Sequence, residues 1–99
     1  MTEEQKKQTY KIAEHYGIKS QEQVAIEECA ELIQAITKSN RNKKSPQELL
    51  EDINAIAGEI ADVLIMCEQL IHLYGVWVDV QEQIEYKISR QLDRMEKGQ

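Results

Sequence analysis

Acidic side chains three positions apart recur along this sequence, and two carboxylates at that spacing share one face of a helix and can bind a cation together. The chain has six such pairs among its 18 acidic residues, where chance gives about three. Four pairs lie in polar surroundings or in expected first turns of helices, where acids favour the helix dipole, and we interpret them as solvated surface. The two pairs that remain are Glu28/Glu31 and Glu59/Asp62.

Glu59 and Asp62 belong to a segment that is apolar on every side, since residues 63–66 (Val-Leu-Ile-Met) already cover a full helical turn. An unpaired ionised carboxylate in such surroundings costs several kcal/mol. The sequence between Lys44 and Lys87 contains no Lys or Arg that could pair with it. Either a basic residue from another segment or a metal ion must therefore compensate these charges.

The group that faces Glu59 and Asp62 is expected to be Glu27, Glu28 and Glu31, because adjacent helices joined by a short loop pack antiparallel. Carboxylate oxygens that converge without histidine form a site for a hard cation such as Mg²⁺ or Mn²⁺. From the residues alone three interpretations stay open: a metal site, a buried ion-pair network, or a solvated acidic face.

Four helices are expected to position these residues, at about 3–16, 21–39, 46–74 and 80–97. Glycine at 17 and 75 predicts where the first and third helices end. Capping residues predict where the second, third and fourth helices begin. These residues are Ser20 with Gln23, Ser45 with Pro46 and Glu48, and Asp79 with Glu82. No convincing strand is present. The sequence therefore predicts an all-α fold in a single domain, 1–99, with a protomer resembling a four-helix bundle.

The third helix predicts an oligomer. Its residues 60–73 are apolar around the whole circumference, and a helix of that kind is buried on all sides. A chain of 99 residues has too little surface to enclose it. We therefore expect a homo-oligomer, a dimer or a tetramer, with this segment at or near the interface.

Composition and charge exclude several classes of protein. With 12 basic against 18 acidic residues and a net charge of −6, the chain lacks the basic stripe of a nucleic-acid binder. No stretch approaches the ~20 apolar residues of a membrane span, and no signal segment opens the chain. Cys29 and Cys67 form no CxxC motif, which argues against zinc and for buried, reduced thiols. We expect a soluble cytoplasmic protein that binds neither nucleic acid nor membrane.

The two acidic motifs resemble a known signature. Residues 27–32 (Glu-Glu-Cys-Ala-Glu-Leu) followed by 59–64 (Glu-Ile-Ala-Asp-Val-Leu) look like the EExxE…ExxD pattern of the all-α nucleoside triphosphate pyrophosphohydrolases, which include MazG, the dimeric dUTPases and phosphoribosyl-ATP pyrophosphohydrolase. The resemblance covers roughly residues 20–94. It implies a MazG-like fold, with four residues as magnesium ligands and Glu27 as a further ligand or a water-orienting base. The four ligands are Glu28, Glu31, Glu59 and Asp62.

The function implied is Mg²⁺-dependent hydrolysis of a nucleoside triphosphate at the α-phosphate, giving a monophosphate and pyrophosphate. Lys87 and Arg90 resemble the K-x-x-R that contacts the triphosphate in MazG-type members. Lys38, on the acidic side of the second helix, is a further candidate for phosphate binding, as is the basic loop at 41–44. Two alternatives stay open: phosphoribosyl-ATP pyrophosphohydrolase, and a non-catalytic helical interaction module.

Overall fold

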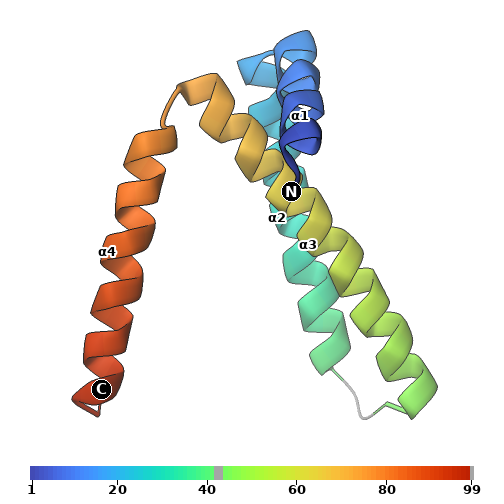
Figure 1. The fold of residues 1–99 in the computed structure, drawn as a ribbon. Coiled ribbons are helices and arrows are strands. Elements are labelled where there is room, and N and C mark those ends of the chain that lie inside the picture. Colours follow the sequence, from blue (N-terminus) through green and yellow to red (C-terminus); the bar gives the residue numbers. More distant parts are fainter. Residues whose placement is uncertain (42–43, 99) are drawn as a thin grey trace.

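The computed structural model describes residues 1–41 and 44–98, and over these residues the chain is helical without any strand (Figure 1). The all-α prediction is thus confirmed. The four helices are α1 (Glu3–Tyr16), α2 (Ile18–Asn40), α3 (Pro46–Tyr74) and α4 (Trp77–Glu96).

The predicted limits of α1 and α3 are confirmed, because strong local signals mark them. Pro46 occupies the first position of α3, and the Ser45 hydroxyl accepts a hydrogen bond from the Glu48 backbone N–H at 3.2 Å. Gly75 ends α3 in the left-handed conformation, with φ 67°, which glycine adopts without the steric penalty of a Cβ. Gly17 ends α1 with φ 86°.

The predicted starts of α2 and α4 are wrong by three residues. α2 begins at Ile18 directly after Gly17, and Ser20 is no cap but lies inside the helix, donating its hydroxyl to Gln21 Oε1 at 3.1 Å. α4 begins at Trp77, so Asp79 belongs to its first turn. In both cases the backbone alone supplies the start: the Gly17 and Val76 carbonyls accept hydrogen bonds from residues four positions ahead, and no side-chain cap is needed.

α2 and α3 lie side by side and run antiparallel (Figure 1). Ala25 from α2 and Met66 from α3 are buried between the helices. A buried polar pair accompanies them, in which Gln21 Nε2 donates a hydrogen bond to Gln69 Oε1 at 2.8 Å. This helix pair is the framework on which both acidic motifs lie.

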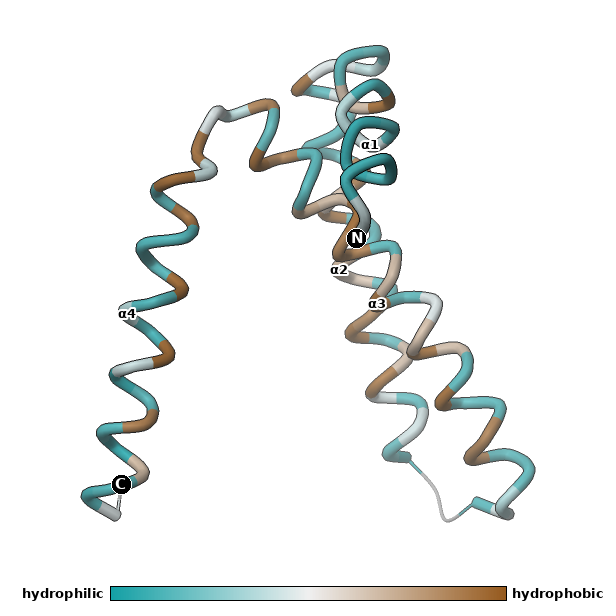
Figure 2. The backbone as a smooth tube through the Cα atoms, viewed as in Figure 1, coloured by the Kyte–Doolittle hydropathy of each residue, from teal (hydrophilic) through white to brown (hydrophobic). Residues whose placement is uncertain are grey.

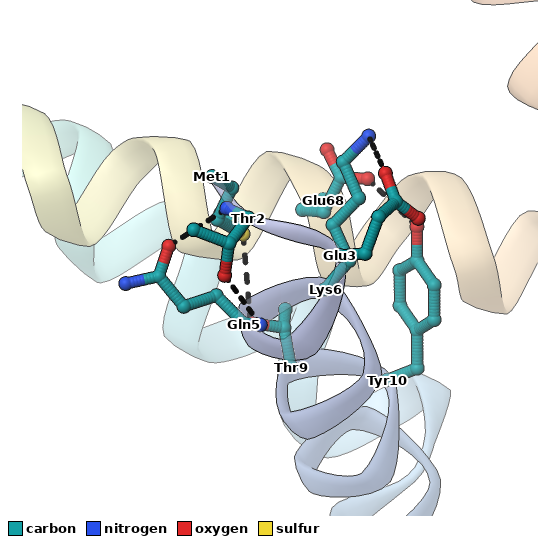
Figure 3. A network of polar contacts seen from close by, with 8 residues as sticks. All are labelled: Met1, Thr2, Glu3, Gln5, Lys6, Thr9, Tyr10 and Glu68. Atoms are coloured by element: carbon teal, nitrogen blue, oxygen red, sulfur yellow. Dashed lines mark hydrogen bonds and ion pairs between the residues drawn. The ribbon is translucent and has the colours of Figure 1, made fainter.

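α1 packs against the second half of α3 through polar and aromatic contacts. The Tyr10 hydroxyl donates to Glu68 Oε1 at 2.8 Å (Figure 3). The Tyr10 ring stacks on His72 with centroids 4.4 Å apart, and His72 Nε2 lies 2.8 Å from Glu14 Oε1. These contacts fix α1 beside the end of α3 that lies away from the loop between α2 and α3.

α4 stands apart from the other helices (Figure 1). Over residues 1–41 and 44–98 it contacts only α3, the helix it follows, and it has no buried residue. A four-helix bundle within one protomer is therefore not what this chain forms: α1, α2 and α3 pack together, and α4 extends as an arm. Its apolar residues recur along the arm (Figure 2), and Ile88 and Leu92 are 57% and 59% exposed, because none of the other helices in the described part of the chain covers them.

Exposed apolar residues also lie on α2 and α3, and Ile26, Ile33 and Leu64 are each about 60% exposed. Ile26 and Ile33 line a groove between α2 and α3, whereas Leu64 lies in a separate pocket beside α1. Cys29 and Cys67, which were expected to be buried, are also exposed in the single chain. Among the described residues, no helix has both the length and the apolar character required to cross a membrane.

Candidate metal centre

Three of the four predicted metal ligands come together between α2 and α3. Glu28 on α2 and Glu59 and Asp62 on α3 each offer a carboxylate oxygen, and these oxygens lie within 4.8 Å of one another. The spacing of three residues places Glu59 and Asp62 on neighbouring positions of one helical face. The antiparallel packing of α2 and α3 brings Glu28 opposite them.

Two of these carboxylates have an oxygen without a partner. Glu28 Oε2 and Glu59 Oε2 are buried and accept no hydrogen bond. Among residues 1–41 and 44–98, no Lys, Arg or His forms an ion pair with Glu28, Glu59 or Asp62. A buried ion-pair network therefore does not compensate this cluster within the described part of the chain.

The carboxylates perturb each other's protonation. Burial raises the pKa of the Glu28 carboxyl, and the negative charges of Glu31, Asp62 and Glu59 raise this pKa further. Burial likewise raises the pKa of Glu59, with added contributions from Glu31 and Asp62. Removal from water and like charge act in the same direction, and each opposes the ionised form. A cation bound between these oxygens would favour the ionised forms and so oppose both effects.

Glu31 and Lys38 lie beside the cluster rather than in it. Together with Glu59 they line an open pocket of about 260 Å³ between α2 and the first half of α3. Glu31 is close enough to Glu28 and Glu59 to raise the pKa of both. Lys38 is the basic side chain of this pocket, so its position agrees with a role in binding a phosphate next to a metal.

Asp52 is a residue that the sequence analysis missed. It lines the same pocket and forms an ion pair with Lys44, with Oδ2 and Nζ 2.9 Å apart and both side chains about 15% exposed. Asp52 lies seven residues before Glu59, which is two turns earlier on the same face of α3. This spacing could have identified Asp52 as part of the candidate site.

Three predicted site residues do not join the cluster in this chain. Glu27 is exposed on α2 and accepts a 3.4 Å hydrogen bond from Gln23 Nε2. Lys87 and Arg90 lie on α4, which contacts α3 but not α2. Arg90 instead lies over the Tyr86 ring, 5.5 Å from its centroid. Of the basic loop, Arg41 is exposed and Lys43 falls outside the described residues.

The donor set fits a hard divalent cation. Oxygen ligands alone, without His or Cys, suit Mg²⁺ and Mn²⁺, and the two unpartnered buried oxygens are available to coordinate one. An ion in this place would neutralise negative charge on a bound phosphate chain and polarise a water molecule. The arrangement can therefore support metal-assisted hydrolysis of a phosphoanhydride.

Sequence comparison gives the class of protein to which this fold and cluster belong. The family model of the MazG nucleotide pyrophosphohydrolase domain matches residues 17–93, which include α2, α3 and most of α4. The chain is thus a member of the MazG nucleotide pyrophosphohydrolase family, an all-helical family of hydrolases. Comparison with curated proteins and with solved structures gave no match.

Proposed function

We propose that this protein is a Mg²⁺-dependent nucleoside triphosphate pyrophosphohydrolase that works as a homo-oligomer, with Mn²⁺ as a possible substitute. The observation that carries the proposal is the group formed by Glu28, Glu59 and Asp62, in which two buried carboxylate oxygens have no partner. Membership of the MazG family supports nucleotides as the class of substrate.

The reaction is the hydrolysis of a nucleoside or deoxynucleoside triphosphate at the α-phosphate. Water attacks the α-phosphorus, and the bond from this phosphorus to the oxygen that bridges to the β-phosphate breaks. The products are a nucleoside monophosphate, pyrophosphate and a proton. Bound Mg²⁺ supplies charge neutralisation and water activation in such reactions, so no covalent nucleophile from the protein is required.

Each acidic residue has a distinct place in this proposal. Glu28, Glu59 and Asp62 hold the metal, and Glu31, at the edge of the pocket, completes the ligand set or binds a second ion. Glu27 lies outside the group; the role proposed for it, from the family resemblance, is to orient the attacking water. Lys38 lines the pocket on the side of Glu31 and is proposed to contact the phosphate chain.

The test is a pyrophosphate-release assay over the common ribo- and deoxyribonucleoside triphosphates, with phosphoribosyl-ATP included, in Mg²⁺ and in chelator. Reaction in water labelled with heavy oxygen should place the label in the monophosphate, because attack occurs at the α-phosphorus. Release of single phosphate with a diphosphate as coproduct would contradict the proposal. Failure to bind any divalent cation would favour a non-catalytic interaction module.

A further inference from the structure

The pocket beside the acidic cluster extends along α2 and α3, and its two ends differ in chemistry. Glu31 and Glu59 line one end, where burial and the charge of Glu31 raise the pKa of Glu59. Lys38 follows Glu31 by seven residues and Asp52 precedes Glu59 by seven, which is two turns or about 10.5 Å along each helix. Because α2 and α3 run antiparallel (Figure 1), both steps lead toward the carboxyl end of α2 and the amino end of α3. Lys38 and Asp52 therefore form the second end of the pocket.

Asp52 is accompanied by a cation that precedes α3 in the chain. Lys44 Nζ lies 2.9 Å from Asp52 Oδ2, and the two side chains are 14% and 15% exposed. In each of the other lysine ion pairs of the described residues, at least one side chain is 62–95% exposed. A pair that is largely removed from water loses much of its Coulombic gain to desolvation. Fold stability is therefore a poor reason for burying this pair.

The geometry of this pair leaves the Lys44 ammonium group able to bind a second anion. Asp52 Oδ2 is buried and accepts no hydrogen bond from residues 1–41 or 44–98, although Lys44 Nζ is within ion-pair distance of it. The attraction between the two charges therefore does not occupy the N–H groups of Lys44, and an ammonium group carries three of them. Lys44 is thus held next to a carboxylate of the pocket lining with N–H donors available for another acceptor.

A phosphate chain in this pocket needs positive charge at both ends. Among the described residues, the lining contains one ammonium group, that of Lys38, against three carboxylates, which are those of Glu31, Asp52 and Glu59. A divalent cation at the acidic cluster would offset the charges at that end, but Asp52 lies two turns away, where Lys38 and Lys44 are the basic groups. This separation is comparable to the reach of an extended triphosphate with its hydrogen bonds. A diphosphate is shorter by one phosphate and would not reach both ends.

We propose that Lys44, held in place by Asp52, binds the terminal phosphate of a triphosphate substrate together with Lys38. The phosphate chain then runs from the acidic cluster toward the amino end of α3, and the nucleoside lies on the other side of the cluster. Lys44 contacts the substrate, whereas Asp52 is a positioning residue that acts through Lys44. This end of the pocket thereby selects triphosphates over diphosphates. That the substrate is a nucleotide rests on the proposed function, but the binding of a polyphosphate chain does not.

Binding of inorganic polyphosphates tests this selection. In isothermal titration calorimetry with millimolar Mg²⁺, Lys44→Ala should weaken tripolyphosphate binding about tenfold or more, which is the effect of one charged hydrogen bond, and should leave pyrophosphate binding unchanged. Lys44→Arg keeps the charge and should retain most of the affinity. Lys19→Ala is the matched control, because it removes a lysine ion pair, with Glu22, whose lysine side chain is 95% exposed. A wild type that binds no tripolyphosphate, or equal losses for both polyphosphates, would overturn the proposal.

Two further variants separate contact with phosphate from simple neutralisation of Asp52. Lys44→Ala alone leaves the buried Asp52 carboxylate unpaired, which can itself repel phosphate or destabilise the fold, whereas Lys44→Ala combined with Asp52→Asn removes that charge as well. The double variant should still bind tripolyphosphate weakly, and recovery of the wild-type affinity would show that Lys44 only neutralises Asp52 and that the proposal is wrong. Asp52→Asn alone should lower the ratio of tripolyphosphate to pyrophosphate affinity, because Lys44 is no longer held at the pocket. An unchanged ratio would reject the positioning role of Asp52.

A measurement without activity separates this proposal from the proposed function. Lysine side chains are acylated with an activated ester, and mass spectrometry follows the rate at each lysine. Tripolyphosphate with Mg²⁺ should slow the acylation of Lys44 and Lys38, pyrophosphate should leave Lys44 unprotected, and Lys19 should react at one rate throughout. Protection of Lys44 in a protein that hydrolyses no nucleotide would support the phosphate site and reject the proposed function. Nucleotide hydrolysis by a protein whose Lys44 stays unprotected would keep the function and reject the phosphate site.

Discussion

Mg²⁺ should raise the melting temperature of this protein much more than that of Asp62→Asn, because Asp62 supplies one of three carboxylates whose oxygens lie within 4.8 Å. A ligand that binds only the folded state adds about 2.7 kcal/mol at 100 times its Kd. For a domain of this size, that corresponds to an increase of about 11–22 °C in Tm. If loss of Asp62 weakens binding about 100-fold, the same Mg²⁺ concentration adds only about 0.4 kcal/mol, or about 2–3 °C.

In chelator the order should reverse. The charge of Asp62 raises the pKa of both Glu28 and Glu59, so its removal relieves repulsion, and Asp62→Asn should melt at or above the wild type. The assay is thermal unfolding followed by circular dichroism, with and without millimolar Mg²⁺. Asp93→Asn is the control, because Asp93 forms only an exposed ion pair with Lys97, which is worth little.

The metal interpretation would be rejected if Mg²⁺ and Mn²⁺ left the Tm of the wild type unchanged and Asp62→Asn had a lower Tm than the wild type in chelator. That result would indicate a basic residue paired with the Asp62 carboxylate.

Three further outcomes are expected. Glu59→Gln should nearly abolish pyrophosphate release, whereas Glu48→Gln, at the exposed start of α3, should leave kcat/KM unchanged; equal loss in both would show that burial does not identify the site. In metal-free protein the raised pKa values of Glu28 and Glu59 contribute stability that is fully present below pH 4.5, their unfolded pKa, and is lost as pH rises through the folded pKa values. Calorimetry should therefore show a steeper fall in Tm toward neutral pH for the wild type than for Glu28→Gln combined with Glu59→Gln. Gln69→Ala should lower the free energy of unfolding by about 1–3 kcal/mol, because it leaves the buried Gln21 amide without its partner, and urea unfolding should detect this.

The sequence predicted the helices well where one residue type determines the backbone. Gly75 needs a positive φ and Pro46 can occupy only the first turn of a helix, so both limits of α3 are confirmed. The starts of α2 and α4 were misplaced because Ser20 and Asp79 have the side chains of good caps, while the backbone had already turned helical before them.

The sequence likewise predicted one part of the candidate site and not the other. Helical spacing and antiparallel packing sufficed to bring Glu28, Glu59 and Asp62 together. They could not place Lys87 and Arg90, because the direction in which α4 leaves α3 depends on contacts that a single sequence does not specify. Adjacent residues of a helix point about 100° apart, and for this reason Glu27 faces solvent although it neighbours Glu28.

The buried Gln21–Gln69 hydrogen bond has a consequence for how the carboxylates can stay opposed. Gln21 lies seven residues before Glu28, and Gln69 lies seven residues after Asp62, so the amide pair is two turns, about 10.5 Å, from the acids along both helices. Repulsion among ionised carboxylates would be relieved if α2 slid along α3. A slide of even one turn would separate the two amides and leave both unpaired in a buried place, which is costly. The glutamine pair therefore acts as a register lock, and it keeps α2 and α3 aligned while the acidic ends of their side chains repel.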